Sequence, residues 1–181
     1  MLKPLLHWYL RRMERHYGYD ATYLHELTNI STGQLRRYMR AQMGARKQGT
    51  APRDAWHAAA IAGALVEDCG PCVQIASDVA VEAGVPGETI KALLTGTPTD
   101  ATAQLGFDYG RALLTDSDSL DELREQVETR WGKEALVAIS FMAMYSRNFP
   151  VLKRALGHAK TCQRVRVGDD DIAVAPQLKA A

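Results

Sequence analysis

Residues 53–72 read RDAWHAAAIAGALVEDCGPC, and this stretch decides the fold that the sequence predicts. Alanine and leucine dominate it as far as Asp68, and the β-branched side chains that favour strands are scarce. We therefore expect a helix from Arg53 to Asp68. Proline suits the first turn of a helix, so residues 69–72 should open a second helix, which ends near Gly84.

Helical periodicity continues on both sides of this hairpin. Apolar residues recur at three- and four-residue spacing and predict further helices within residues 4–13, 20–27, 31–43, 88–94, 97–114, 119–132, 136–145 and 150–157. Only residues 163–167 alternate like a strand, so the predicted fold class is all-α. Segment 136–145 is apolar all round, which predicts central burial. The tail beyond Gly168 carries three consecutive aspartates and is expected to be loose.

The length of 181 residues fits one structural domain. Within it we distinguish an N-terminal helical accessory segment (1–48), a core (49–167) and a C-terminal tail (168–181). With 46% hydrophobic and 24% charged residues, the chain can bury a core without disulfide or metal staples. This composition excludes a disordered or collagen-like class.

Charge and cysteine content restrict the setting in which the protein works. A formal net charge of +1 gives no overall basic field that would attract nucleic acid or a membrane surface. The longest apolar run, from Ala135 to Tyr145, is shorter than the ~20 residues of a membrane span, so neither a span nor a signal peptide is expected. Three cysteines are too few for a secreted disulfide framework. We expect a cytoplasmic protein.

The tetrapeptide Cys69-Gly70-Pro71-Cys72 carries the clearest chemical signal. Two thiols one helical turn apart at a helix start can form a disulfide and reopen it. Free backbone N–H groups favour a thiolate at this position, and the second thiol is close enough to resolve a mixed disulfide. Glu67 and Asp68 oppose this effect because their negative charges disfavour a neighbouring thiolate.

Three other interpretations of the pair remain open. Thioredoxins carry the same tetrapeptide after a buried strand, but the residues upstream of Cys69 are rich in alanine, which disfavours that fold. Two thiolates are half of a tetrahedral zinc site, with Cys162 and five scattered histidines as the remaining candidates. The cysteines could also be two small buried side chains at a tight helix junction.

The order of helix, Cys-x-x-Cys, second helix and residues 90–94 resembles the alkylhydroperoxidase D and carboxymuconolactone decarboxylase superfamily. Residues 53–94 resemble its core hairpin, and the runs FDYGRAL (107–113) and GKEAL (132–136), continuing to Gly157, resemble the helices that follow. Because both cysteines are present, the resemblance is to the redox branch of the superfamily.

This resemblance implies an all-helical fold that assembles as homo-oligomers, trimers or hexamers. It implies a thiol-disulfide oxidoreductase or an alkylhydroperoxidase-like peroxidase, in which Cys72 attacks a peroxide or disulfide substrate and Cys69 resolves the product. No metal or flavin cofactor takes part in that cycle. A dithiol reductant protein, thioredoxin-like or lipoyl-bearing, would restore the reduced pair.

Two positions depart from the pattern of the redox members. Ala76 stands where they commonly have a histidine, four residues after the second cysteine, and His57 stands where they commonly have a glutamate, twelve residues before the first. One hypothesis is that His57 faces the cysteines and relays protons, with Glu67 as a second proton carrier. The alternative is a packed or surface histidine beside Trp56, with weak or lost peroxidase activity.

The N-terminal segment suggests a different class of function. No acidic residue occurs between Glu26 and Asp54, and two short helices with basic side chains loosely resemble a helix-turn-helix; these side chains are Arg36, Arg37, Arg40, Arg46 and Lys47. The alternative function is a non-catalytic helical assembly or DNA-binding module with redox-sensitive cysteines. A solvated face or a subunit contact explains the arginines equally well. The same segment holds an aromatic cluster that favours packing or an interface over a ligand site; its members are Tyr9, Tyr17, Tyr19 and Tyr23.

Overall fold

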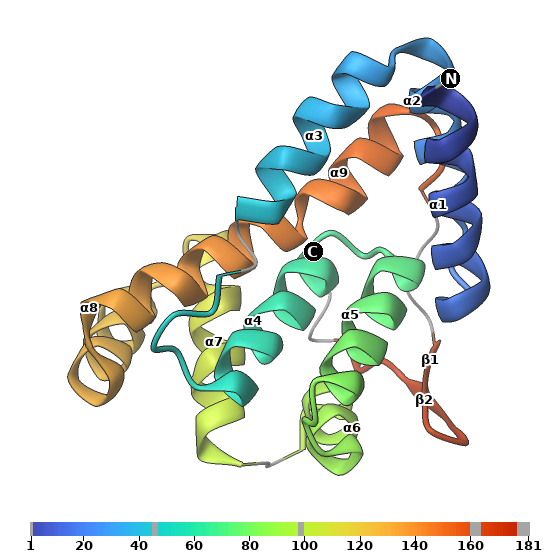
Figure 1. Ribbon diagram of the computed structural model, residues 1–181. Coiled ribbons are helices and arrows are strands. Elements are labelled where there is room, and N and C mark those ends of the chain that lie inside the picture. Colours follow the sequence, from blue (N-terminus) through green and yellow to red (C-terminus); the bar gives the residue numbers. More distant parts are fainter. Residues whose placement is uncertain (1, 45–46, 98–99, 160–163, 177–181) are drawn as a thin grey trace.

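The computed structural model describes residues 2–44, 47–97, 100–159 and 164–176. These residues form helices and one two-stranded antiparallel ribbon, which confirms the all-α class (Figure 1). The elements are α1 (Leu2–Tyr17), α2 (Thr22–Ile30), α3 (Thr32–Gly44), α4 (Arg53–Val66), α5 (Gly70–Glu82), α6 (Gly87–Thr95), α7 (Ala101–Thr115), α8 (Leu120–Ser146), α9 (Asn148–Ala155), β1 (Arg164–Val167) and β2 (Asp170–Ala173).

Helix α4 is the central element of the core. Every residue from Ala55 to Val66 is buried, and the helix packs against α5, α7 and α8. Small residues let these helices approach closely. A Cβ added at Gly106 of α7 would lie 2.3 Å from the carbonyl oxygen of Ala55, and one added at Gly63 of α4 would lie 2.5 Å from the carbonyl oxygen of Ala143 in α8.

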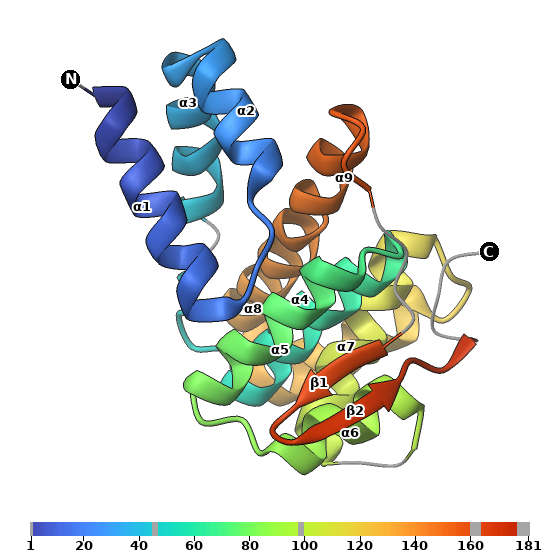
Figure 2. The same cartoon turned by 90° about the vertical axis from the view of Figure 1, so that its right-hand side faces the viewer.

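The N-terminal helices α1–α3 form a second cluster that stands to one side of α4–α7 (Figure 2). Its buried side chains, such as Tyr23 and Leu35, pack against residues of α9 and against Ile75 of α5. The ammonium group of Lys153, a buried residue of α9, lies 4.2 Å from the centroid of the Tyr19 ring. Such a cation–π contact stabilises a charge that burial otherwise disfavours.

Two breaks divide the long C-terminal helical stretch where the sequence predicts them. Gly132 interrupts α8 with a φ of 83°, a conformation that favours glycine. Helix α8 ends at Ser146, and Pro150 falls in the first turn of α9, where its missing N–H has no intrahelical partner to lose.

The C-terminal residues differ from expectation. The tail beyond Gly168 was expected to be loose, but residues 170–173 form β2, which pairs with β1 from Arg164↔Ala173 to Val167↔Asp170. Val174 is buried, and the N–H of Ala175 donates to the carbonyl of Leu94 at 3.0 Å. The expectation is wrong because β1 offers a pairing edge and α5 and α6 offer an apolar surface beneath the ribbon.

The expected central burial of segment 136–145 is also wrong. One face of α8 packs against α4 and α7 through Ala135, Ile139 and Ala143. The opposite face leaves an apolar stripe in solvent that continues into α9; its members are Val137, Phe141, Met144 and Val151, each 40–49% exposed.

The stretch Leu120–Ala155 is long enough and apolar enough to cross a membrane by length and composition alone. An 18-residue window within it has a mean hydropathy of 1.3, and 28% of that window is buried. The stretch is longer than the apolar run that the sequence highlights. The inner face of α8 packs against α4 and α7, as the face of a core helix does. The expectation from the sequence that the chain does not span a membrane stays a prediction.

The close approach of α7 to α4 predicts a stability effect. We expect Gly106→Ala to lower the free energy of unfolding by about 1–3 kcal/mol, because the new methyl group meets the backbone of Ala55, which cannot move without displacing α4. Urea titration followed by far-ultraviolet circular dichroism measures the change.

Gly44→Ala is the matched control, since an added Cβ there meets nothing within 4 Å. We expect it to change the stability by less than about 1 kcal/mol. Equal stability of the two variants would contradict the proposed helix contact.

Candidate redox site

Cys69 and Cys72 lie at the start of α5, as the sequence predicts. Cys69 is the N-cap residue, Pro71 occupies the first turn, and the N–H groups of Cys72 and Val73 donate to the carbonyl of Cys69 at 3.0 and 2.9 Å. The two Cα atoms are 5.3 Å apart and the sulfur atoms form a disulfide. Both residues are buried, with 4% and 3% exposure. A substrate can therefore reach the sulfur atoms only through an opening in the protein.

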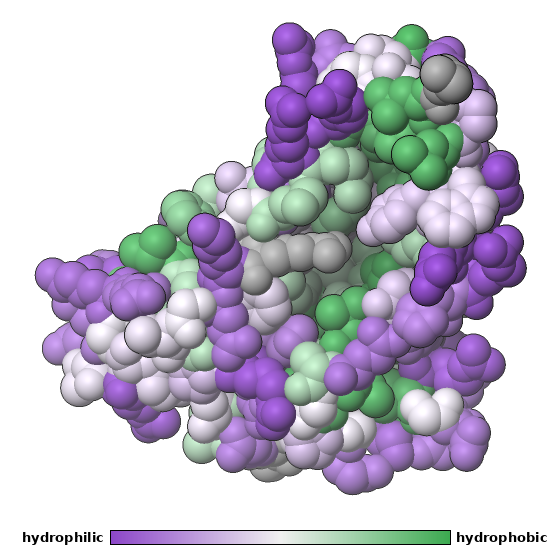
Figure 3. Space-filling model, in the orientation of Figure 1, coloured by the Kyte–Doolittle hydropathy of each residue, from purple (hydrophilic) through white to green (hydrophobic). Residues whose placement is uncertain are grey.

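A cavity of about 350 Å³ provides such an opening. It lies between the N-terminal helices and the core, and Figure 3 shows the surface hollowed between α1 and α3 on one side and α4 and α5 on the other, with apolar side chains inside. Cys72 lines this cavity together with His57 and Ala76, whereas Cys69 does not. Of the two cysteines, Cys72 is therefore the one in contact with the cavity.

His57 lies on α4 and is 5% exposed. Burial lowers the pKa of its imidazole to about 4, and the positive charge of Arg53 acts in the same direction. The ring stands edge-on to that of Trp56, with the centroids 4.9 Å apart. At neutral pH the imidazole is therefore uncharged, and its low pKa makes it a weaker base than an ordinary histidine.

Glu67, the second expected proton carrier, is held by two arginines. Its side chain is 5% exposed and accepts hydrogen bonds from the guanidinium groups of Arg147, at 2.7 Å from Nε, and Arg154, at 2.6 Å from Nη2. These contacts tie the end of α4 to the region where α8 meets α9. Because both carboxylate oxygens are engaged, the geometry favours a structural role for Glu67 and offsets its negative charge near the cysteines.

The cavity brings in residues that the sequence interpretation assigned to packing. Tyr9 and Met13 of α1, Tyr23 of α2 and Met39 of α3 form its outer wall. Two of these residues, Tyr9 and Tyr23, belong to the aromatic cluster that the sequence shows near the N-terminus. Its periodicity was compatible with simple packing, and which core surface it covers depends on the tertiary structure.

The structure also bears on the zinc-site and thioredoxin interpretations of the cysteine pair. The part of the chain that the structure describes contains no group of three or more His, Cys, Asp or Glu side chains that could hold a metal ion. Cys162, the third potential zinc ligand, lies outside the described residues. Helix α4 precedes the cysteines where a thioredoxin has a strand, which agrees with the prediction against that fold.

The fold and the site define a class: an all-helical protein with a cysteine pair at a helix start and a cavity lined by one of the two cysteines. Comparison with known proteins adds no closer identification, because no family model, no curated protein and no solved structure matches the chain.

The lowered pKa of His57 makes stability depend on pH. An unfolded chain protonates this histidine near its ordinary pKa of 6.5, whereas the folded protein resists protonation until about pH 4. His57 therefore costs no stability above pH 6.5 and makes the folded state about 3 kcal/mol less stable as the pH falls to 4.

We expect His57→Gln to remove this component, so the variant should lose about 3 kcal/mol less than the wild type between pH 7 and pH 4. Urea titrations at the two pH values measure the difference. An identical pH dependence in the two proteins would show that the imidazole titrates normally in the folded state.

The ion pairs of Glu67 predict that a substitution there changes the stability of the protein and leaves the reactivity of the cysteines unchanged. We expect Glu67→Gln to lower the free energy of unfolding by about 1–2 kcal/mol, because two charge-assisted hydrogen bonds weaken while the partly exposed arginines regain water. The rate at which hydrogen peroxide oxidises the reduced cysteine pair should not change. Mass spectrometry of the pair after timed quenching measures this rate.

Glu88→Gln is the matched control, since the side chain of Glu88 is 86% exposed and its pair with Lys91 contributes little. A large fall in the oxidation rate of Glu67→Gln, in protein shown to be folded, would support the hypothesis that Glu67 carries a proton.

Proposed function

We propose that the chain is a thiol-dependent peroxidase or thiol-disulfide oxidoreductase, and a divergent member of the redox branch of the alkylhydroperoxidase D and carboxymuconolactone decarboxylase superfamily. The observation that carries the proposal is that Cys72, already bonded to Cys69, and the neutral imidazole of His57 line the same cavity. Nucleophile, resolving thiol and proton acceptor are the groups that this chemistry requires.

The peroxide reaction follows from this arrangement. His57 takes the proton of the Cys72 thiol, and the thiolate attacks one peroxide oxygen. The O–O bond breaks, Cys72 becomes a sulfenic acid, and the leaving oxygen takes the proton from the imidazolium. With a pKa near 4 the imidazole is a weak base, so taking the proton of the Cys72 thiol is the costly transfer, and the imidazolium then gives a proton readily to the leaving oxygen.

The second half of the cycle restores the thiols. The Cys69 sulfur attacks the Cys72 sulfenic acid, forms the disulfide and releases water. A dithiol reductant then supplies two electrons and two protons and becomes a disulfide itself. We propose a protein dithiol for this role and a reducing, cytoplasmic setting in which it would be available.

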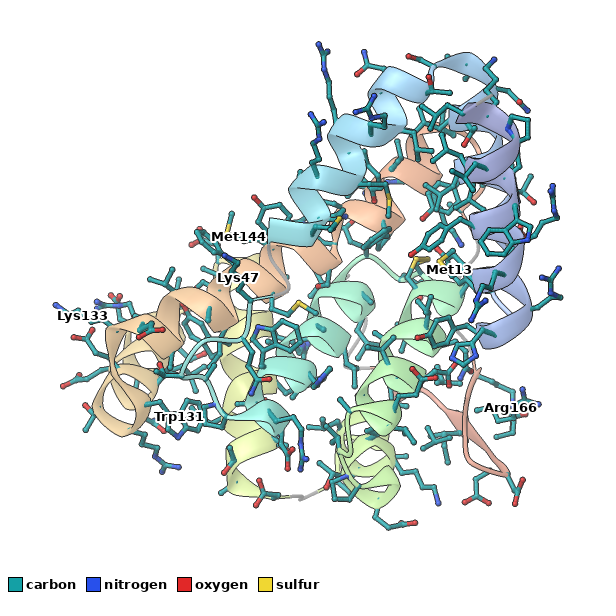
Figure 4. All side chains as sticks on the ribbon, in the orientation of Figure 1. Met13, Lys47, Trp131, Lys133, Met144 and Arg166 are labelled. Atoms are coloured by element: carbon teal, nitrogen blue, oxygen red, sulfur yellow. A yellow bond between two sulfur atoms is a disulfide. The ribbon has the colours of Figure 1, made fainter. Side chains whose placement is uncertain are left out.

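The homo-oligomer that the resemblance implies is part of the same proposal. The apolar stripe of Val137, Phe141, Met144 and Val151 is the surface that a second copy would cover. Its members follow the three- and four-residue spacing by which helices pair along a seam. Figure 4 shows Met144 on the outward side of α8.

Peroxide consumption with dithiothreitol as the donor tests the enzymatic proposal. We expect turnover by the wild type and background rates for Cys72→Ser; in Cys69→Ser treated with peroxide and no dithiothreitol, we expect a Cys72 sulfenic acid that dimedone traps. His57→Ala should lower the rate by about a hundredfold or more, as loss of general acid–base catalysis does. Cys162→Ser serves as the control for cysteine loss in general.

A wild-type rate in Cys72→Ser would overturn the enzymatic proposal. The non-catalytic assembly or DNA-binding module would then be the better interpretation. Exposed arginines on α3 favour that second candidate, namely Arg36, Arg37 and Arg40, while Leu35 on the same helix is buried. Binding of duplex DNA, seen as slower electrophoretic migration of the DNA and weakening steeply as salt is added, would support it.

A further inference from the structure

Helix α1 stands at an outer edge of the molecule, as both Figure 1 and Figure 2 show. Its inward side packs on the N-terminal cluster through Leu6, Leu10 and Met13. Its outward side faces away from the elements around it. A helix in this position can meet a surface much larger than the protein.

The first half of the outward side is apolar and aromatic. Leu5, Trp8 and Tyr9 are 60%, 50% and 51% exposed, and Leu2 is 41% exposed. Spacings of three and four residues place them on one side of the helix. Figure 3 shows apolar and near-neutral surface over this part of α1. Tryptophan and tyrosine favour the boundary between water and lipid, because each ring combines an apolar body with one polar group.

The second half of the outward side is basic. Arg11, Arg12 and Arg15 are exposed, and so is Lys3 at the start of the helix. None of the three arginines has an ion pair with a carboxylate among the described residues, whereas an arginine such as Arg147 of the core does. Their positive charges are therefore available to an anionic partner.

The acidic side chains closest to these arginines are already engaged within the protein. Glu14, the one acidic residue of α1, accepts a hydrogen bond from the N–H of Ala21 at 3.1 Å. Glu82 of α5 contacts His16 and accepts a hydrogen bond from the hydroxyl of Tyr17 at 2.9 Å. These contacts fasten α1 to α2 and α5 and leave the outward side positive.

The small net charge of the whole chain conceals this local field. Residues 1–48 contain nine Lys and Arg against three Asp and Glu, and residues 49–181 contain 13 against 18. An anionic partner would therefore be attracted to the N-terminal segment and repelled by the rest of the chain. The lack of an overall basic field does not apply to this segment taken alone.

An open groove of about 490 Å³ lies beside the arginines. Its described lining comes entirely from α1 and consists of Tyr9, Arg12, Met13, Arg15, His16 and Tyr17. A guanidinium group binds a phosphate through two parallel hydrogen bonds. The groove thus offers places for phosphate oxygens directly beside the exposed aromatic side chains.

We propose that the outward side of α1 binds the surface of a membrane that contains anionic phospholipids. The arginines contact the phosphate and carboxylate groups of the lipids, and Leu5, Trp8 and Tyr9 enter the boundary between headgroups and acyl chains. This pairing of cations with apolar side chains favours lipid over nucleic acid, whose backbone offers no apolar layer. The association is peripheral, because the other side of α1 stays packed on the protein.

Sedimentation of the full-length, disulfide-bonded protein with sucrose-loaded vesicles tests the proposal. In about 0.1 M salt we expect binding to phosphatidylcholine vesicles with about 30% phosphatidylserine to be at least about tenfold stronger than binding to phosphatidylcholine alone. Salt at about 1 M should release most of the protein, because it screens the arginines. Equal binding to the two kinds of vesicle, or no binding to either, would overturn the proposal.

Two double variants locate the surface. Arg12→Gln with Arg15→Gln should weaken binding to the anionic vesicles about tenfold or more, since each basic side chain near such a surface contributes about fivefold. Arg130→Gln with Lys133→Gln is the matched control and should bind as the wild type does. It removes the same charge from exposed side chains on α8, where Lys133 lies at the other end of the molecule from Met13 of α1 (Figure 4). An equal loss in both variants would overturn the assignment to α1.

Trp8 reports whether the aromatic side chains enter the lipid. Brominated acyl chains quench the emission of an indole that they contact, so bound wild-type protein should lose emission. Trp8→Phe keeps the buried Trp56 and the partly buried Trp131, and it should lose little. Unquenched emission from bound wild-type protein would contradict the proposed insertion.

Two other partners are outcomes of the same set of experiments. A dimer in lipid-free solution that dissociates in the Arg12→Gln and Arg15→Gln variant would show that a second copy covers α1, and it would overturn the proposal. Duplex DNA bound through these arginines by protein that ignores the vesicles would do the same. Cys72→Ser should bind vesicles as the wild type does, because Cys72 lies on α5 and the proposal uses no redox step. Vesicle binding and peroxide turnover can therefore fail separately.

Discussion

The close packing of α4 against its neighbours is the constraint on which the rest of the structure depends. Glycine and alanine at the contacts bring the backbone of α7 near Ala55 and that of α8 near Gly63. A helix held this way on several sides buries every residue from Ala55 to Val66, including His57. The same packing fixes the end of α4, from which the chain turns directly into the cysteine pair.

The end of α4 and the cavity differ in their electrostatics. At the end of α4, the Glu67 carboxylate accepts hydrogen bonds from Arg147 and Arg154, so a carboxylate next to the cysteines connects α4 to the region where α8 meets α9. In the cavity, no compensating charge is present among the lining residues described, and burial keeps His57 neutral. A pKa this far below neutrality leaves the imidazole unprotonated and makes it a weak base.

The N-terminal helices give the site its distinctive shape. Without them, the face of α4 and α5 that carries His57, Cys72 and Ala76 would be an open apolar surface; with them it is a cavity with defined volume. Their attachment combines apolar packing on α9 with polar contacts such as His16–Glu82, in which the Nε2 and Oε1 atoms are 2.6 Å apart. Access to Cys72 therefore depends on a segment distant from it in sequence.

The sequence by itself determined the helical class, the positions of most helices, the strand at 164–167 and the cysteine pair at a helix start, because local periodicity and turn-forming residues govern these features. It also singled out His57, whose neutrality depends on burial. Only the tertiary structure decided the cavity, the two arginine partners of Glu67, the exposed stripe on α8 and the pairing of β2. Each of these depends on which distant surface covers a residue, and local sequence patterns do not specify that.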